Sequence, residues 1–219
     1  FFNRMDEDTL KQFQEISQIL RKRIYSIQMP QAVILDLDST LLAAYGKQEG
    51  RAFNFHYRSN GYHPLVCYDG ITGDLIKIQL RDGAAYSCTG VTDFLQPILD
   101  EYLNDYPTIH LLLRGDSGFA TPDLYKQCEE NGTSYVIRLM ENFIKESKSG
   151  FDFSAVSSHN RIVNANRVQV HALAYNIFNW FRRLALSANM RKQRIDTVRL
   201  KLLKIAAKVV RSARYITFK

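Results

Sequence analysis

The sequence has few cysteines and no long apolar run, and these two absences exclude several classes of protein. Its 219 residues include three cysteines, an odd number without a CxxC pair, so neither a disulfide-stapled fold nor a common zinc site is expected. The five histidines show no metal-ligand spacing. No apolar run approaches the roughly 18 residues that cross a bilayer, and the opening FFNRMDEDTL has no signal-peptide pattern. We therefore expect a cytoplasmic protein without a membrane partner.

Proline and glycine are scarce as well, with 5 and 11 residues, and the chain has no internal repeat or low-complexity tract. This excludes repeat arrays and long disordered linkers. Hydrophobic residues make up 46% of the sequence and aromatic residues 12%, which is enough for one substantial core. The composition predicts one compact unit, with room for a helical extension.

Acidic residues are nearly missing from the C-terminal end. Residues 181–219 hold twelve Lys and Arg against a single acid, Asp196, whereas the other 180 residues hold seventeen basic and twenty-one acidic residues. A basic segment on an otherwise acidic chain is typical of a polyanion-binding protein. A solvated helix face explains such a charge run about equally well.

The spacing of apolar residues predicts alternating strands and helices. An amphipathic helix over 5–28 ends before Pro30, and a buried strand follows over 32–38. Three short runs then predict an antiparallel meander over 52–58, 62–69 and 73–81. Beyond it the pattern predicts a helix, a strand, a helix and a strand over 91–104, 108–116, 121–132 and 133–139.

From residue 140 onward the pattern is helical. The stretch 167–184 is apolar almost all round, as expected of a helix buried against a sheet. The stretch 195–213 has one apolar stripe and one basic stripe, the latter formed by Lys201, Lys204, Lys208 and Arg211. We expect this helix to dock by its apolar side and to offer the basic side to a polyanion.

Acidic residues follow the predicted strands at two places and recur on the helix after residue 140. Asp36 and Asp38 end the apolar run VILDLD, Asp116 follows LLLRG, and Glu141 begins ENFIKESK. Carboxylates brought together from distant parts of a chain make a site for hard divalent cations such as Mg²⁺. Each acid also has a plainer interpretation, since Asp116 alone fits a capping residue and Glu141 with Lys145 fits a helix surface pair.

The motifs DLDSTLL, LRGDSGFATPDLY and ENFIKESK occur in this order with the layout strand, helix, strand, helix, strand between them. Together with GYHPLVCYDGITG and IVNANRVQVHALAYNIFNWFRRL, they resemble a DDE transposase of bacterial insertion sequences, in the group with a DST first motif and an ENxIKE third motif. The resemblance implies an α/β fold: an RNase H-like mixed five-stranded sheet flanked by helices, with a helical basic C-terminal segment. The expected parts are an N-terminal helix (1–30), the catalytic core (31–160) and a helical DNA-contacting part (161–219).

The resemblance also implies roles for individual residues. Asp38, Asp116 and Glu141 are the expected catalytic carboxylates, which hold two Mg²⁺ or Mn²⁺ ions, with Asp36 as a further metal ligand. Lys148, and more weakly Lys145, would contact a DNA phosphate, and Arg114 would either do the same or pair with Asp116. The expected reactions are hydrolysis at the ends of an insertion sequence and strand transfer into target DNA, by a homodimer in the synaptic complex. The expected place is the bacterial cytoplasm, on the nucleoid when DNA is bound.

One departure from the resemblance concerns the chain between the fifth strand and the glutamate. Members of the group usually carry a long, largely β insertion there, whereas Leu139 runs directly into Met140 in this sequence. The chain also starts at Phe1 rather than Met. The sequence therefore resembles an internally shortened, N-terminally incomplete member.

Two other functions fit parts of the sequence. VILDLDSTLL also resembles the first motif of haloacid-dehalogenase-like phosphatases, in which Asp36 would be the nucleophile and Asp38 the general acid. That family needs a closely spaced acid pair later in the chain, and Asp123 lies seven positions after Asp116. The other alternative is a catalytically impaired transposase remnant that still binds DNA through its basic segment.

Overall fold

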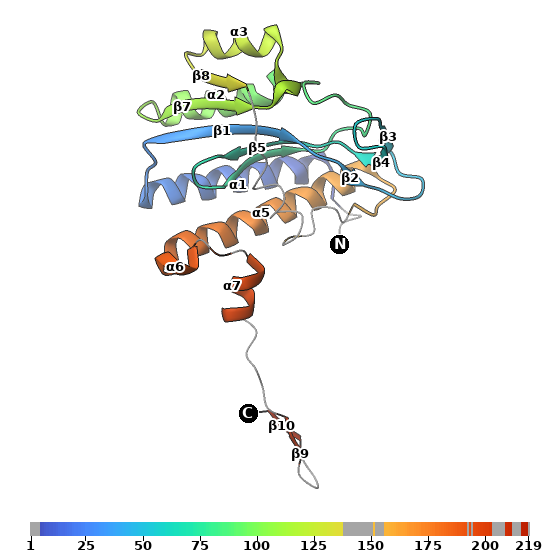
Figure 1. Cartoon of the computed structure of the whole chain (residues 1–219), viewed down its shortest axis with the longest axis vertical. Helices are drawn as coiled ribbons and strands as arrows, with labels where there is room; N and C mark the ends of the chain where they lie inside the picture. Colours follow the sequence, from blue (N-terminus) through green and yellow to red (C-terminus); the bar gives the residue numbers. More distant parts are fainter. Residues whose placement is uncertain are drawn as a thin grey trace.

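The computed structural model describes residues 5–137, 151, 156–191, 193, 195–202, 209–211 and 216–218 (Figure 1). The elements of the body are, in chain order, α1 (Glu7–Ile27), β1 (Ala32–Ser39), β2 (Leu42–Ala43), β3 (Ala52–Asn54), β4 (Ser59–Tyr62), β5 (Leu65–Asp69), β6 (Leu75–Gln79), α2 (Val91–Asp105), β7 (His110–Gly115), the short 3₁₀ helix η2 (Ser117–Phe119), α3 (Pro122–Glu130), β8 (Ser134–Ile137) and α5 (Arg161–Ala185).

A mixed five-stranded sheet forms the centre, in the order β6-β5-β1-β7-β8. The strands β1, β7 and β8 are parallel, and β5 is antiparallel to both β1 and β6. Helices α2 and α3 are the connections between the parallel strands, as a parallel pair requires. The predicted α/β fold with an RNase H-like sheet is confirmed.

Strand β1 lies in the middle of the sheet, and its side chains alternate between two different environments. Val33, Leu35 and Leu37 are at most 2% exposed and pack against the helix α2 and Tyr25 of α1. The intervening residues, among them Asp36 and Asp38, are only half-buried on the opposite face. The sequence motif VILDLD is therefore an alternation of core and polar positions rather than a uniformly buried run.

Helix α5 covers the edge strand β6 and runs beside α1 (Figure 1). The predicted helix is present, but its buried face is not apolar all round: it includes five amide side chains, from Asn164, Asn166, Gln169, Asn176 and Asn179. Asn176 accepts the N–H of Leu75 and donates to its carbonyl, both at 2.7 Å. Gln169 donates to the carbonyl of Ile78 at 2.7 Å. These side chains bind backbone groups of an edge strand that another chain would otherwise pair with.

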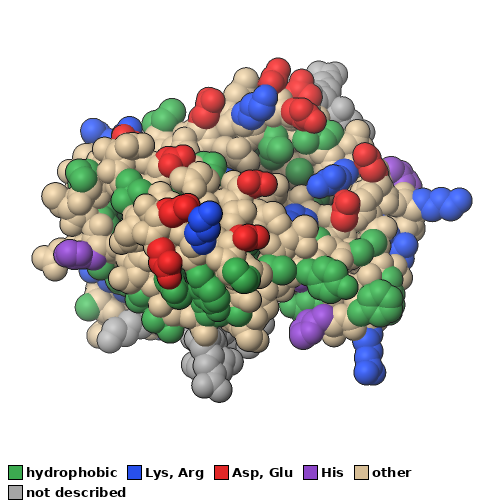
Figure 2. Space-filling view, turned by 90° about the horizontal axis from the view of Figure 1, so that it is seen from above, with side chains coloured by type: hydrophobic (Ala, Val, Ile, Leu, Met, Phe, Trp, Pro, Cys, Tyr) green, Lys and Arg blue, Asp and Glu red, His purple; other side chains and the backbone are tan. Residues whose placement is uncertain are grey.

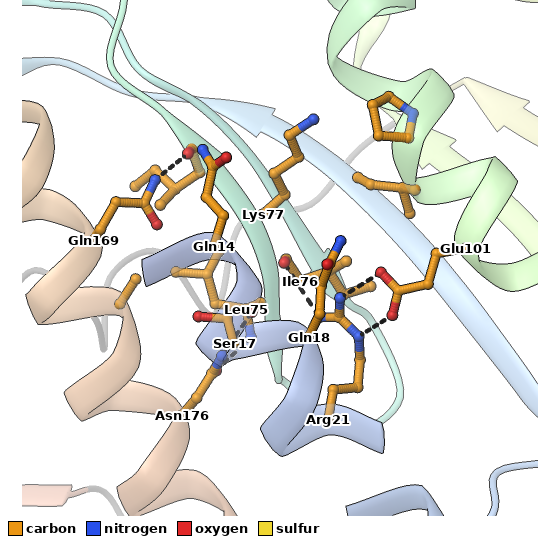
Figure 3. A pocket seen from close by; sticks show the side chains of 14 residues that line it. Gln14, Ser17, Gln18, Arg21, Leu75, Ile76, Lys77, Glu101, Gln169 and Asn176 are labelled. Carbon is orange, nitrogen blue, oxygen red and sulfur yellow. Dashed lines mark hydrogen bonds and ion pairs between the residues drawn. The ribbon is translucent and has the colours of Figure 1, made fainter. Parts of the chain in front are cut away.

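A cavity of about 160 Å³ lies where α1, α2, α5 and β6 meet (Figure 3). On its α1 side, the buried Arg21 forms two hydrogen bonds with Glu101, at 3.0 and 2.8 Å, and a third with the carbonyl of Ile76, at 3.2 Å. Figure 3 shows labelled polar side chains around this space from all three helices and from β6. None of the predicted site residues lines this cavity.

The predicted three-stranded meander is wrong in its first strand. Only residues 52–54 of the range 52–58 are a strand, and β3 belongs to a separate three-stranded sheet in the order β2-β4-β3. The strands β5 and β6 alone continue the central sheet. Asn54 is the reason that β3 ends early, because its side chain accepts the N–H groups of His56 and Tyr57 and turns the chain there.

The C-terminal part also differs from the predicted helix over 195–213. It contains α6 (Ala188–Arg191), α7 (Ile195–Leu202), and the paired strands β9 (Val209–Arg211) and β10 (Ile216–Phe218). Val209, Val210 and Ile216 are β-branched residues, which favour strand over helix. Within the described residues, no helix is long and apolar enough to cross a membrane.

We predict that Asn176→Ala destabilises the protein by about 2 kcal/mol or more, because it leaves a buried N–H and a buried C=O of β6 without partners. Urea unfolding followed by circular dichroism measures the loss. Ile177→Ala is the matched control on the same helix, since Ile177 is 53% exposed, and we expect a change within about 0.5 kcal/mol. Equal losses for the two variants would contradict the edge-binding role of Asn176.

Candidate active site at the carboxyl ends of β1 and β7

The register of the parallel pair β1–β7 brings two predicted site residues together. Asp36 lies opposite Arg114 in that register. Asp116 directly follows the end of β7 at Gly115, and extending the register by two residues sets it opposite Asp38. The backbone of Asp116 is still extended, with φ −79° and ψ 178°. Because neighbouring strands lie about 4.8 Å apart and side chains repeat every two residues, both carboxylates belong to the same end and the same face of the sheet.

Each aspartate is oriented by a nearby backbone N–H. Asp38 Oδ1 accepts the N–H of Ser39 at 2.6 Å. Asp116 Oδ1 accepts the N–H of Gly118 at 2.8 Å and caps η2, while the side chain remains exposed. Carboxylate oxygens are the ligands that a hard cation takes.

The second glycine of the RGDSG motif, Gly118, is closely packed. A Cβ atom at Gly118 would lie 3.0 Å from Asp116 Oδ1 and 3.1 Å from the Cβ of Ser87. Ser87 in turn meets the hydroxyl of Ser39, with 2.9 Å between the two oxygens. Ser87 thus touches the residue after Asp38 and the turn after Asp116, which shows independently that the two strand ends are adjacent.

Arg81 holds the loop that carries Ser87. Its buried guanidinium donates to the carbonyls of Tyr86, Ser87 and Thr89, at 3.1, 3.1 and 2.7 Å, and its Nε donates to the carbonyl of His63 at 3.0 Å. Burial lowers the pKa of Arg81 to about 10, so the group is charged at neutral pH. Sequence reasoning missed Arg81 and Ser87, since neither lies in a periodic pattern or a recognisable motif.

Asp36 and Arg114 form an ion pair with each other. Arg114 Nε and Nη2 donate to the two carboxylate oxygens of Asp36 at 2.9 and 2.5 Å, and this hydrogen bonding raises the pKa of Arg114. The sequence predicted a metal ligand at Asp36, and a phosphate or Asp116 contact at Arg114. In the structure the carboxylate of Asp36 and the guanidinium of Arg114 bind each other, because the strand register places them side by side.

Several predicted site residues lie outside the described residues: Glu141, Lys145, Lys148, Lys204 and Lys208. Lys201 is exposed on α7, and Arg211 lies on β9 rather than on the predicted helix. In the part of the chain that the structure describes, no three His, Cys, Asp or Glu side chains cluster as metal ligands. The structure therefore brings together the two aspartates and leaves the glutamate as a prediction.

The surface over α2 and α3 is acidic, and Figure 2 shows the red side chains on this face. These two helices expose a single basic residue, Lys126, against six acids: Asp93, Asp100, Asp105, Asp123, Glu129 and Glu130. A phosphate backbone is repelled by such a face. A polyanion would approach from the side of the strand ends instead.

The chain belongs to the family of the transposase DDE domain, group 1, whose model matches residues 1–142 and 139–219. The match is divided at the position where the sequence runs from the fifth strand directly into Met140 and Glu141. No protein with a curated function matches the sequence.

Among solved structures, the catalytic domain of the Mos1 mariner transposase is similar with a TM-score of 0.37 and 8% identity, over 80% of this chain and 96% of that one. The Mos1 paired-end complex with the left transposon end gives 0.35 and 10%, over 80% and 63%. The piggyBac transposase synaptic complex with hairpin DNA gives 0.33 and 18%, over 49% and 23%. The chain thus spans less than two thirds of the transposase chains in the last two complexes.

The phosphatase alternative has lost its main support. Its nucleophile would be Asp36, whose two oxygens are bound by Arg114. The family match covers the whole chain and points to transposases instead.

We predict a coupling free energy of about 1–2 kcal/mol between Asp36 and Arg114, as is typical of hydrogen bonds to charged groups. A double-mutant cycle with Asp36→Asn and Arg114→Gln, measured by urea unfolding, gives this value. The control cycle uses the exposed pair Lys126–Glu130, 3.7 Å apart, for which we expect less than about 0.5 kcal/mol. A coupling for Asp36 and Arg114 no larger than the control would refute the ion pair in solution.

Proposed function

We propose that this chain is a DNA transposase that catalyses metal-dependent phosphodiester hydrolysis and strand transfer at the ends of an insertion sequence. The observation that carries the proposal is the register of β1 and β7, which makes Asp38 and Asp116 neighbours at one end of the sheet. Membership of the DDE transposase family supports the same reaction. Asp38, Asp116 and Glu141 are the three carboxylates that we assign to it.

The donor set of these residues fits Mg²⁺ or Mn²⁺, which bind carboxylate oxygens with open positions left for phosphate and water. Two such ions, held by Asp38, Asp116 and Glu141, would supply the activation of the attacking oxygen and the stabilisation of the leaving one. Asp36 is not assigned to the metal, because Arg114 occupies its oxygens. Arg114 in turn neutralises one carboxylate beside the site, which lowers the repulsion of an approaching phosphate.

The protein's own part in the reaction is to orient the reacting groups. The hydrogen bonds from Ser39 and Gly118 fix the two carboxylates. In the hydrolytic step an oxygen of water forms a bond to phosphorus, the bond to the 3′-oxygen breaks, and the proton of the water passes to solvent. In strand transfer a DNA 3′-hydroxyl takes the place of the water. Pre-orientation of the carboxylates reduces the entropy cost of both steps.

The DNA partner is the element end and then the target, and we propose a homodimer in the synaptic complex. The basic segment around Lys201, Lys204, Lys208 and Arg211 would contact the phosphate backbone and fix the position of the duplex without reading its sequence. The acidic face of α2 and α3 would point away from the DNA.

We predict that the chain nicks a labelled duplex carrying the element end in the presence of Mg²⁺ or Mn²⁺. Asp38→Asn, Asp116→Asn and Glu141→Gln should each lower the rate by roughly a hundredfold or more, the scale for losing one group that stabilises developing charge. Asp123→Asn is the matched control, an exposed acid on α3, and should leave the rate unchanged. Gel electrophoresis of the products measures the rates.

Two results would argue against this function. Binding of the duplex without nicking by the wild type would support the catalytically impaired remnant. Turnover of a small phosphate ester that survives Glu141→Gln but disappears in Asp36→Asn would favour an active site of the phosphatase kind.

We further predict that DNA affinity falls steeply with salt and that the triple variant Lys201→Gln, Lys204→Gln, Lys208→Gln has a shallower dependence. Each phosphate contact contributes about 0.9 to the slope of log K against log salt, so three lost contacts should reduce it by about 3. Fluorescence anisotropy at several salt concentrations measures the slope. An unchanged slope would show that these lysines do not contact phosphates.

A further inference from the structure

The turn between β3 and β4 exposes several aromatic side chains. Phe53 and Phe55 are 43% and 85% exposed, and their rings meet edge to face with centroids 5.2 Å apart. His56 and Tyr57 follow, exposed as well, with their rings 4.8 Å apart. We call Phe53, Phe55, His56 and Tyr57 the aromatic tip. Rings of this size are among the most costly side chains to leave in water, so their exposure together indicates a contact surface.

The aromatic tip has a fixed conformation. Asn54 is 6% exposed, accepts the N–H groups of His56 and Tyr57 at 3.1 and 3.2 Å, and donates to the carbonyl of Gly83 at 2.8 Å. Arg58 closes the turn with φ 49°, a left-handed conformation that non-glycine residues adopt only when the surroundings enforce it. The rings are therefore held outward by the backbone of the turn.

The aromatic tip adjoins the two aspartates. The hydroxyl of Tyr57 donates to the carbonyl of Ser39, the residue after Asp38, at 3.4 Å. The ring of Tyr57 also meets that of His63, with centroids 5.9 Å apart, and His63 Nδ1 lies 2.7 Å from the carbonyl of Ala85. The loop that begins there carries Ser87, which touches both strand ends. A DNA strand whose phosphate lies at the two aspartates would therefore run past the aromatic tip.

The charge around the aromatic tip favours DNA over an apolar protein partner. Along the chain, Lys47, Arg51 and Arg58 precede and follow the rings with one acid, Glu49, between them. The exposed Asp82 also lies near this loop, where it pairs with Arg161 at 3.7 Å. This contrasts with the acidic face of α2 and α3. Aromatic rings interleaved with basic residues are the pattern of surfaces that stack bases while tracking the backbone.

We propose that the aromatic tip binds unpaired DNA bases by stacking, next to the phosphate that is cut. This rests on the proposed function, since it assumes that the phosphodiester lies at Asp38 and Asp116. The bases of an intact duplex are stacked on each other and are not available, so the surface would select a single-stranded or extruded nucleotide. Every base has a flat face, and the preference should therefore be largely independent of sequence.

The test uses the full chain without divalent cations, so that binding is measured in the absence of cleavage. Fluorescence anisotropy compares a short blunt duplex with the same duplex carrying a single-stranded overhang, and 2-aminopurine in the overhang reports stacking through quenching. We expect the overhang to bind about tenfold more tightly or better, the value that base stacking on aromatic rings implies. Phe55→Ala should remove most of this preference and the quenching, and Phe55→Trp should keep both.

The matched control is Leu103→Ala, because Leu103 is an exposed apolar residue, at 41%, on α2, whose acidic face would point away from the DNA. It should bind both probes as the wild type does. Circular dichroism and urea unfolding should show Phe55→Ala to be as stable as the wild type, since Phe55 is 85% exposed.

Equal binding of the two probes by the wild type, or an unchanged preference in the double variant Phe53→Ala, Phe55→Ala, would overturn the proposal. So would a dimer that becomes a monomer in Phe55→Ala with both probes weakened equally, because the surface would then join two copies of the chain. The proposed function fails separately: a wild type that prefers the overhang but never nicks would refute catalysis alone. Asp38→Asn should lose nicking and keep the preference.

Discussion

The pairing of β1 with β7 is the interaction on which both the fold and the candidate site depend. Val33, Leu35 and Leu37 are buried on one face of β1, so a shift of one residue would turn Asp36 and Asp38 into the core. The burial of three apolar side chains thus determines the register. The same register puts Asp38 beside Asp116 and Asp36 beside Arg114, so that core stability and carboxylate geometry have a single physical cause.

Buried polar side chains stabilise this sheet at its edge strand β6 and near the carboxyl ends of β1 and β7. On the edge strand β6, Asn176 and Gln169 bind backbone groups that would otherwise be open to another strand. At the strand ends, Arg81 gathers three carbonyls and positions the loop with Ser87. The buried amides and the buried guanidinium take the place of water as hydrogen-bond partners of these backbone groups. Any other packing would leave buried polar groups unpaired, so these contacts favour one specific arrangement of the elements.

Much of the architecture could be predicted from local patterns. The five strands of the central sheet and the helices α1, α2 and α3 follow from apolar spacing, and the motifs indicate Asp38 and Asp116. The errors arose where tertiary contacts override local preference. Asn54 ends β3 early, the buried face of α5 contains amides, and the segment predicted as helix contains the strand β9. Glu141 lies outside the described residues, and its place beside the aspartates stays a prediction.

The sequence by itself determined the strand over 32–38, the position of Asp116 directly after a later strand and the concentration of basic residues after residue 180, since these depend on neighbours along the chain. The tertiary structure alone decided that Asp36 pairs with Arg114 and that Tyr57 reaches Ser39, contacts 78 and 18 residues apart in the sequence. It also decided that the rings of the aromatic tip face solvent beside the aspartates. The physical reason is that a side chain's partner depends on strand register and on turn geometry, and the chain acquires both only when its core is buried.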